Sequence, residues 1–199
     1  MTFKSQLDSL FNSLRTTHQK SDFQPEKIRH LAEEHILNRW DVEGTLLLMI
    51  GKSLWEDMTN NQQLSLKEEF KLTLLRYFME AYAYYDGQNV HFEKLILNKD
   101  QNKGWVGISI ELQYAPDMPV EFNIIQSKSG DWLFRDIRFQ GIQYSKMKRN
   151  YYQNKISEIG VSGLINELAQ KNEAFFAETG LSKSIQNKKF NSGTSGSGD

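Results

Sequence analysis

The stretch that decides the fold runs from Trp105 to Tyr114 and has the sequence WVGISIELQY. Apolar side chains occupy every second position from Val106 onward, and the positions between them carry glycine, serine, glutamate and glutamine. Successive side chains of a strand point to opposite faces of a sheet, so this alternation predicts a strand with one buried and one solvated face. Such one-sided strands are typical of antiparallel sheets.

The sequence around this stretch predicts three more strands in a meander. A turn at residues 99–103 separates it from an earlier strand, and Pro116 to Pro119 reverses the chain after it. Ser129-Gly130-Asp131 is a further turn signal. The four predicted strands cover residues 89–97, 105–114, 120–124 and 132–139.

Helical periodicity flanks the meander on both sides. Asp41 is placed to cap a helix that runs to about Met58, and Ser65-Leu66-Lys67-Glu68 has the capping-box spacing at the start of the next helix. The predicted helices cover residues 3–14, 25–40, 42–58, 65–85, 142–156 and one that opens at 160–163. The fold class we expect is α+β, with a curved antiparallel four-stranded sheet packed against a bundle of helices and an apolar cavity between them.

The predicted helix at 65–85 carries two apolar stripes on different faces. One stripe is enough to dock a helix, so two indicate that this helix is sandwiched or lines an apolar cavity. The apolar face of the Val106–Tyr114 strand lies opposite. The alternative is a closed core built from the same residues. The expected cavity walls are Leu47, Ile50, Leu54, Phe78, Tyr82, Val106, Ile108, Ile110, Phe122, Ile124, Ile137 and Ile142.

The composition predicts a single globular domain over residues 1–182. A polar tail at 183–199 has the glycine and serine content of an appended linker. There is no cysteine, which excludes disulfides and thiolate chemistry, and the net charge of −1 argues against nucleic acid as a partner. We expect no metal site, because His30 and His35 project from different sides of a helix. We also expect no stable membrane insertion, since no apolar run approaches the length of a span.

Two polar features leave alternatives open. Asp136 is the one acidic residue that we considered as a catalytic base, as in cone-shaped α+β enzymes related to ketosteroid isomerase. The alternative is a structural carboxylate bound to neighbouring donors. The run Lys146, Lys148 and Arg149 is either a docking surface for anionic head groups or an acidic partner, or a solvated helix face.

Several segments together carry a family resemblance. They are HILNRWD at 35–41, GKSLW at 51–55, the aromatic helix from Phe70 to Gln88, the stretch 130–142, and 152–168. In order and spacing they resemble motifs of the MlaC (toluene-tolerance) family. The stretch 130–142 is similar to W-x-x-x-D-V-x-x-x-G-V, and 152–168 is similar to Y-x-x-x-I-x-x-x-G-V-x-G-L-I-x-x-L. The similarity covers about residues 25–172, and Gln140, Gln143 and Tyr144 depart from the family pattern.

The resemblance implies a periplasmic phospholipid carrier rather than an enzyme, with no catalytic residue and no cofactor besides the bound lipid. The family holds acyl chains in an apolar cavity and leaves the head group at the surface. Its partners are an outer-membrane lipoprotein–porin complex and an inner-membrane ABC transporter complex with an MCE-domain ring, and the pathway maintains the lipid asymmetry of the outer membrane. No signal peptide is visible after Met1, so we expect the printed sequence to begin after the cleavage point.

Overall fold

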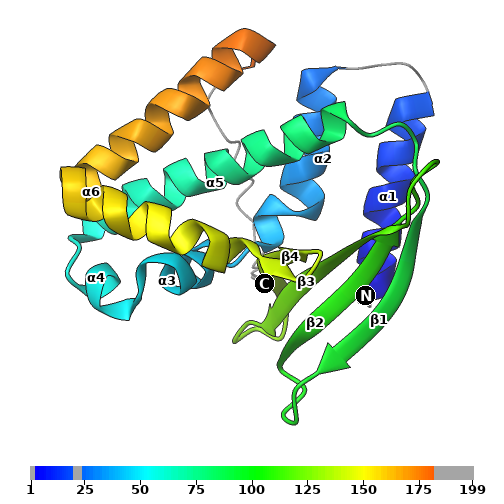
Figure 1. Cartoon of the computed structure of the whole chain (residues 1–199), viewed down its shortest axis with the longest axis horizontal. Helices are drawn as coiled ribbons and strands as arrows, with labels where there is room; N and C mark the ends of the chain where they lie inside the picture. Colours follow the sequence, from blue (N-terminus) through cyan, green and yellow to red (C-terminus); the bar gives the residue numbers. More distant parts are fainter. Residues whose placement is uncertain (1–2, 20–23, 182–199) are drawn as a thin grey trace, which may run out of the picture.

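A computed structural model describes residues 3–19 and 24–181, so the predicted tail at 183–199 lies outside the described residues. The helices are α1 (Phe3–Gln19), α2 (Pro25–His35), the 3₁₀ helix η1 (Leu37–Arg39), α3 (Val42–Ile50), α4 (Lys52–Glu56), α5 (Asn60–Ala83) and α6 (Tyr144–Thr179). The strands are β1 (Val90–Leu97), β2 (Lys103–Ile110), β3 (Met118–Gln126), β4 (Trp132–Phe139) and β5 (Ile142–Gln143). The α+β class is confirmed: helices form one layer and the antiparallel sheet the other (Figure 1).

The sheet is a meander in the order β1-β2-β3-β4-β5. The predicted alternation is confirmed from Val106 to Ile110, where Val106 pairs with Phe122 and Ile108 with Val120 on one apolar face. The prediction that this strand continues to Tyr114 is wrong. Its partner β3 begins opposite Ile110, so residues 111–117 form the connection, and Tyr114 is 91% exposed.

The count of four strands is also wrong, because a short fifth strand follows β4. Gln140 and Gly141 both have positive φ, which closes a two-residue turn, and Ile142 then pairs with Phe139. Ile142 therefore lies in a strand and α6 begins two residues later, at Tyr144. This helix continues to Thr179 through a kink at Gly160, whose φ of 72° is not helical, at the predicted boundary between the last two helices.

The starts and ends of the middle helices differ from the prediction in two places. Asp41 caps α3 as expected, but Gly51, with φ of 88°, ends this helix and separates it from α4. The long helix α5 begins at Asn60 rather than at Ser65. Thr59 and Gln62 have the same capping-box spacing, and the structure uses them: the Thr59 hydroxyl accepts from the Gln62 N–H, and the Gln62 side chain accepts from the Thr59 N–H.

In the part of the chain that the structure describes, the buried apolar side chains form three clusters. The α3–α6 cluster contains Leu46, Met49, Ile50, Phe70, Tyr144, Tyr152 and Leu164 among others. The α1–α2–α5 cluster is built around Leu10, Leu14, Ile28, Leu75 and Phe176. The sheet cluster consists of Val106, Ile108, Val120, Ile124 and Phe134. Ile137 packs against both the sheet cluster and the α3–α6 cluster, and Phe11 against both the sheet cluster and the α1–α2–α5 cluster.

Candidate functional site

The predicted cavity walls are distributed over all three clusters. Ile50, Leu47 and Leu54 belong to the α3–α6 cluster, and Tyr82 and Phe78 to the α1–α2–α5 cluster. The sheet cluster takes Val106, Ile108, Ile110, Phe122, Ile124 and Ile137. Ile142 stands apart at 63% exposed, since it lies on the short edge strand β5. The structure thus divides the predicted walls among three clusters, and only those of the sheet cluster lie on the apolar face of the sheet.

The apolar face of the sheet is covered only in part. Val106, Ile108 and Ile124 at its centre are buried. Toward both edges, Phe92, Leu95 and Phe139 share that face by their pairing with Ile108, Val106 and Val120, and each of the three is exposed. The inner face of the sheet therefore carries exposed apolar side chains toward both edges, which is typical of a surface that binds an apolar ligand or partner.

An open groove of about 700 Å³ lies between α1 and α2. Six polar residues on one side of α1 line it, together with Leu31 of α2. The six are Asp8, Ser9, Asn12, Ser13, Thr16 and Thr17. No predicted wall residue is among them. The hydroxyls of Thr16 and Thr17 donate to carbonyl oxygens of α1 itself, so the groove has the character of a solvated helix surface.

Asp136 lies at the corner between the sheet and α6, where its side chain is fully buried. One carboxylate oxygen accepts from the backbone N–H groups of Ile137 and Ser145, at 2.9 and 3.1 Å. The other accepts from the Ser145 hydroxyl at 2.6 Å and the Gln143 amide at 3.3 Å. Gln143, the N-cap residue of α6, makes no side-chain cap, so Asp136 supplies an acceptor to the first turn of this helix from a neighbouring strand.

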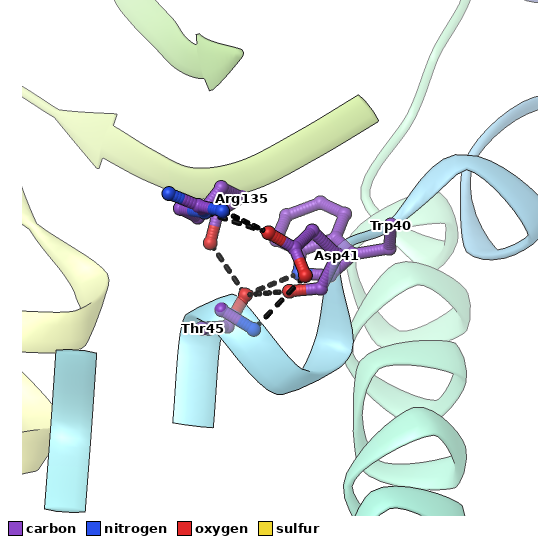
Figure 2. A network of polar contacts seen from close by, with 5 residues as sticks. Trp40, Asp41, Thr45 and Arg135 are labelled. Carbon is purple, nitrogen blue, oxygen red and sulfur yellow. Dashed lines mark hydrogen bonds and ion pairs between the residues drawn. The ribbon is translucent and has the colours of Figure 1, made fainter. Parts of the chain in front are cut away.

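A second polar junction ties α3 to the sheet (Figure 2). The Asp41 carboxylate accepts from the Gly44 N–H at 2.9 Å and from the Arg135 guanidinium at 2.7 Å. Thr45 lies between the two elements: its hydroxyl accepts from the Trp40 indole at 2.8 Å and lies within hydrogen-bond distance of the carbonyl oxygens of Asp41 and Arg135. Asp41 and Asp136 therefore both fix helices to β4.

The three residues of the basic run on α6, Lys146, Lys148 and Arg149, differ in the contacts that they make. Arg149 donates twice to the carbonyl oxygen of Leu48 in α3, at 2.7 and 3.1 Å. Lys148 is half-buried, with its ammonium 5.8 Å from the centre of the Tyr77 ring and 6.0 Å from that of Tyr144. Lys146 is exposed. Of the three predicted docking residues, Lys146 is thus the one best placed to meet a partner.

A cationic and aromatic cluster between α5 and α6 was missed at the sequence level. It consists of Arg76, Tyr77, Tyr144 and Lys148. The Arg76 guanidinium lies 4.9 Å from the centre of the Tyr77 ring, whose edge meets Tyr144 at 6.1 Å between ring centres. Burial raises the pKa of the Tyr144 hydroxyl, the phenols of Tyr152 and Tyr77 add to this rise, and Arg76 opposes it. The sequence contained one signal for this cluster: Arg76 lies among the aromatic residues of the helix predicted at 65–85.

In residues 3–19 and 24–181, no three His, Cys, Asp or Glu side chains are grouped so that they can hold a metal ion. None of the helices described there is both long enough and apolar enough to span a membrane.

Comparison with protein families decides the relationship of the chain. The profile of the family described as "MlaC protein" matches residues 4–170, which is most of the sequence. The chain belongs to the MlaC family. The match confirms the resemblance seen in the motifs, and it extends that resemblance to α1. No curated protein matches this MlaC-family chain significantly in sequence.

A solved structure shares the fold of this MlaC-family chain. It is the phospholipid-binding protein from Ralstonia solanacearum in complex with a phospholipid, which is 22% identical to this chain. The superposition has a TM-score of 0.74 and covers 86% of this chain and 95% of the other. At this identity the likeness concerns the fold, including the sheet with its helical cover.

Proposed function

We propose that this MlaC-family chain is a phospholipid carrier that holds acyl chains between the sheet and the helices. The observation that carries the proposal is the family match over residues 4–170, together with a fold shared with a protein solved with a phospholipid bound. The predicted walls support it, because Ile110, Phe122 and Ile137 lie on the sheet side of this interface and are only half-buried.

The energetics fit a carrier better than a storage protein. Burying an acyl chain stabilises the complex against water by about 0.8 kcal/mol per CH₂ group. The competing environment is a bilayer, which offers nearly the same stabilisation. Net transfer is then close to neutral, and the carrier both loads and unloads lipid. A half-open apolar face serves exchange of this kind because the chains can leave without unfolding the domain.

The wider role follows from the family. We infer that the chain works in the periplasm and shuttles phospholipid between an outer-membrane lipoprotein–porin complex and an inner-membrane MCE-domain ABC transporter complex. That traffic maintains the lipid asymmetry of the outer membrane. The run Lys146, Lys148 and Arg149 is the docking surface we propose for one of these partners, and Lys146 and Arg149 are exposed.

We assign no catalytic step to Asp136. A catalytic base needs a reactive oxygen directed at a substrate. All four donors given above are protein groups of the corner itself, and together they occupy both carboxylate oxygens. The role that fits this geometry is to hold α6 against β4.

The carrier function is tested by lipid uptake from vesicles with a matched pair of variants. Phe122 and Ile125 lie on the same strand and on opposite faces of the sheet, and both are half-buried. Phe122→Asp places a charge among the proposed walls and should abolish uptake of phospholipid by the folded protein. Ile125→Asp should retain it. Equal uptake by the two folded variants would count against a binding site on the inner face.

A further inference from the structure

The cluster of Arg76, Tyr77, Tyr144 and Lys148 holds two buried polar atoms whose hydrogen-bonding capacity is unused. Within the described residues, the Arg76 Nε has no hydrogen-bond partner. The Tyr144 hydroxyl, in a side chain only 8% exposed, lies near the Tyr77 hydroxyl but makes no hydrogen bond of good geometry with it or with any other described group. Buried polar groups are nearly always hydrogen-bonded, since a buried donor without an acceptor has lost its hydrogen bond to water and gained none in exchange. Two such groups in one cluster indicate that something other than this chain completes it.

The chemistry of the missing partner follows from the groups that face it. The Nε of arginine can only donate, so its partner must be an acceptor, and the tyrosine hydroxyl can donate to the same group. The ammonium of Lys148 lies beside the same two tyrosine rings. The one carboxylate recorded at Arg76 is Glu80, which lies 3.7 Å from the Nη1 atom and leaves Nε free. The cluster therefore has two cations, Arg76 and Lys148, and one carboxylate, Glu80. This excess of positive charge favours binding of an anion with several acceptor oxygens.

The place of the cluster limits the ligand further. Tyr144 belongs to the α3–α6 cluster, and Tyr77 and Ile137 pack against it. Ile137 also packs against the sheet cluster, so the polar cluster adjoins the interface where the acyl chains are proposed to lie. Lys148 and Tyr77 are half-buried, which leaves this side of the site open toward solvent. A ligand with an anionic group joined to an apolar body fits both surroundings.

We propose that Arg76, Tyr144 and Lys148 bind the phosphate diester of the carried phospholipid. This inference rests on the proposed carrier function and deepens it. The Arg76 Nε and the Tyr144 hydroxyl donate to phosphate oxygens, and the Lys148 ammonium neutralises the charge. Tyr77 holds the cations in place through its ring. The chain therefore selects lipids with a phosphate over neutral lipids that have the same acyl chains.

The test uses Tyr144→Phe in the delipidated full chain, with Tyr151→Phe as its control on the same helix. The Tyr151 hydroxyl is bound to Glu167 at 2.6 Å, so the control removes a hydroxyl that already has a partner. Tyr144→Phe should leave the melting temperature of the lipid-free protein unchanged or raise it, because no hydrogen bond of good geometry is lost. It should weaken uptake of phosphatidylglycerol from vesicles about tenfold, as expected for a lost hydrogen bond to a charged group. Tyr151→Phe should bind as wild type does.

A second pair keeps the inference independent of the tyrosine. Lys148→Met should also weaken phosphatidylglycerol uptake, whereas Lys155→Met, which removes a partner of Glu167, should not. Diacylglycerol with the same chains should bind weakly, and equally to wild type and variants. Wild-type uptake of phosphatidylglycerol with no effect of Tyr144→Phe or Lys148→Met would overturn the phosphate site and leave the carrier function standing. Failure of wild type to take up either lipid would overturn both.

A final arm separates a lipid phosphate from a free anion. Inorganic phosphate at millimolar concentration should raise the melting temperature of the wild-type chain much less than phosphatidylglycerol does. The reverse result, stabilisation by inorganic phosphate and none by the lipid, would overturn the assignment to a lipid head group.

Discussion

Asp136 and Asp41 each join a helix to strand β4 through a single carboxylate. Asp136 accepts from the first turn of α6, and Asp41 accepts both from the first turn of α3 and from Arg135 on β4. Burying a carboxylate is unfavourable unless donors replace water, and at both positions they do. These residues therefore fix how the helical layer meets the sheet, which determines the shape of the space between them.

Replacing Asp136 with asparagine should destabilise the domain without removing lipid binding. The amide places an NH₂ group where a carboxylate oxygen now accepts two donors, so we expect a loss of about 1–3 kcal/mol in the free energy of unfolding. Urea denaturation measures it. Asp131→Asn, on an exposed turn, should change the value by less than about 0.5 kcal/mol. Unchanged stability together with lost lipid uptake would instead favour a direct role of Asp136 in the site.

Replacing Gly44 with alanine should also be destabilising. Gly44 is buried, and an added Cβ atom would overlap the Asp41 carboxylate and the Arg135 Nε of the junction in Figure 2. Forcing these groups apart should cost about 1–3 kcal/mol, despite the better helix propensity of alanine. Thermal unfolding measures it, with Ser53→Ala on the exposed surface of α4 as the control. An increase in stability would show that the junction can shift at no cost.

At the scale of elements, α6 consists of two helical halves that meet at a kink. The kink at Gly160 separates its halves, and a polar network joins them across the kink. Glu167 on the second half binds the Tyr151 hydroxyl at 2.6 Å and the Lys155 ammonium at 3.2 Å on the first, and Lys171 closes the network at 2.6 Å. These contacts link the two halves of α6 across the kink.

This network predicts a dependence of stability on pH. Hydrogen bonds from Lys171, Tyr151 and Lys155 lower the pKa of Glu167 from 4.5 to about 2. Because the folded-state pKa is depressed, the stabilisation is complete above pH 4.5 and is lost as the pH falls toward 2. The free energy of unfolding of wild type should fall more steeply over that window than that of Glu167→Gln. Parallel curves would mean that the network contributes nothing, whereas Glu56→Gln on exposed α4 should follow wild type.

The docking prediction belongs to the first half of α6. Lys146→Glu should slow lipid transfer to a membrane partner complex and leave the melting temperature unchanged, because Lys146 is exposed. Arg149→Glu should slow transfer and also destabilise the protein, since its guanidinium binds the Leu48 carbonyl of α3. Transfer assays with purified complexes measure the rate, with Lys128→Glu on the β3–β4 turn as control. An unchanged rate for Lys146→Glu would make the run a solvated face.

Local patterns predicted these elements well where one physical signal stood alone. The alternation from Val106 to Ile110 and the cap at Asp41 needed no tertiary information. The start of α5 was ambiguous because two capping boxes stand six residues apart, and only packing selects Thr59. The end of β2 depends on where its partner β3 begins. The Arg76–Tyr144 cluster joins helices that are separated by the whole sheet in sequence, so no local pattern contains it.

At the scale of the whole molecule, the core of the described residues consists of three clusters of buried apolar side chains rather than one. Domains usually have a single contiguous core, and here Ile137 and Phe11 bridge the sheet cluster to the two helical ones. The sheet is attached to the helices at the Asp41 and Asp136 junctions and through apolar side chains such as Ile137 and Phe11. The sequence predicted both layers, but the way they share their contacts depends on the tertiary structure.

The most direct test of the account is native mass spectrometry of the purified full chain, with lipid extraction from the same sample. The account predicts that the chain carries a phospholipid, seen as an added mass that disappears on denaturation and reappears as phospholipid in the extract. It predicts the same adduct after a delipidated sample is incubated with phospholipid vesicles. A chain that remains at its bare mass under both conditions, while folded, would contradict the proposed function.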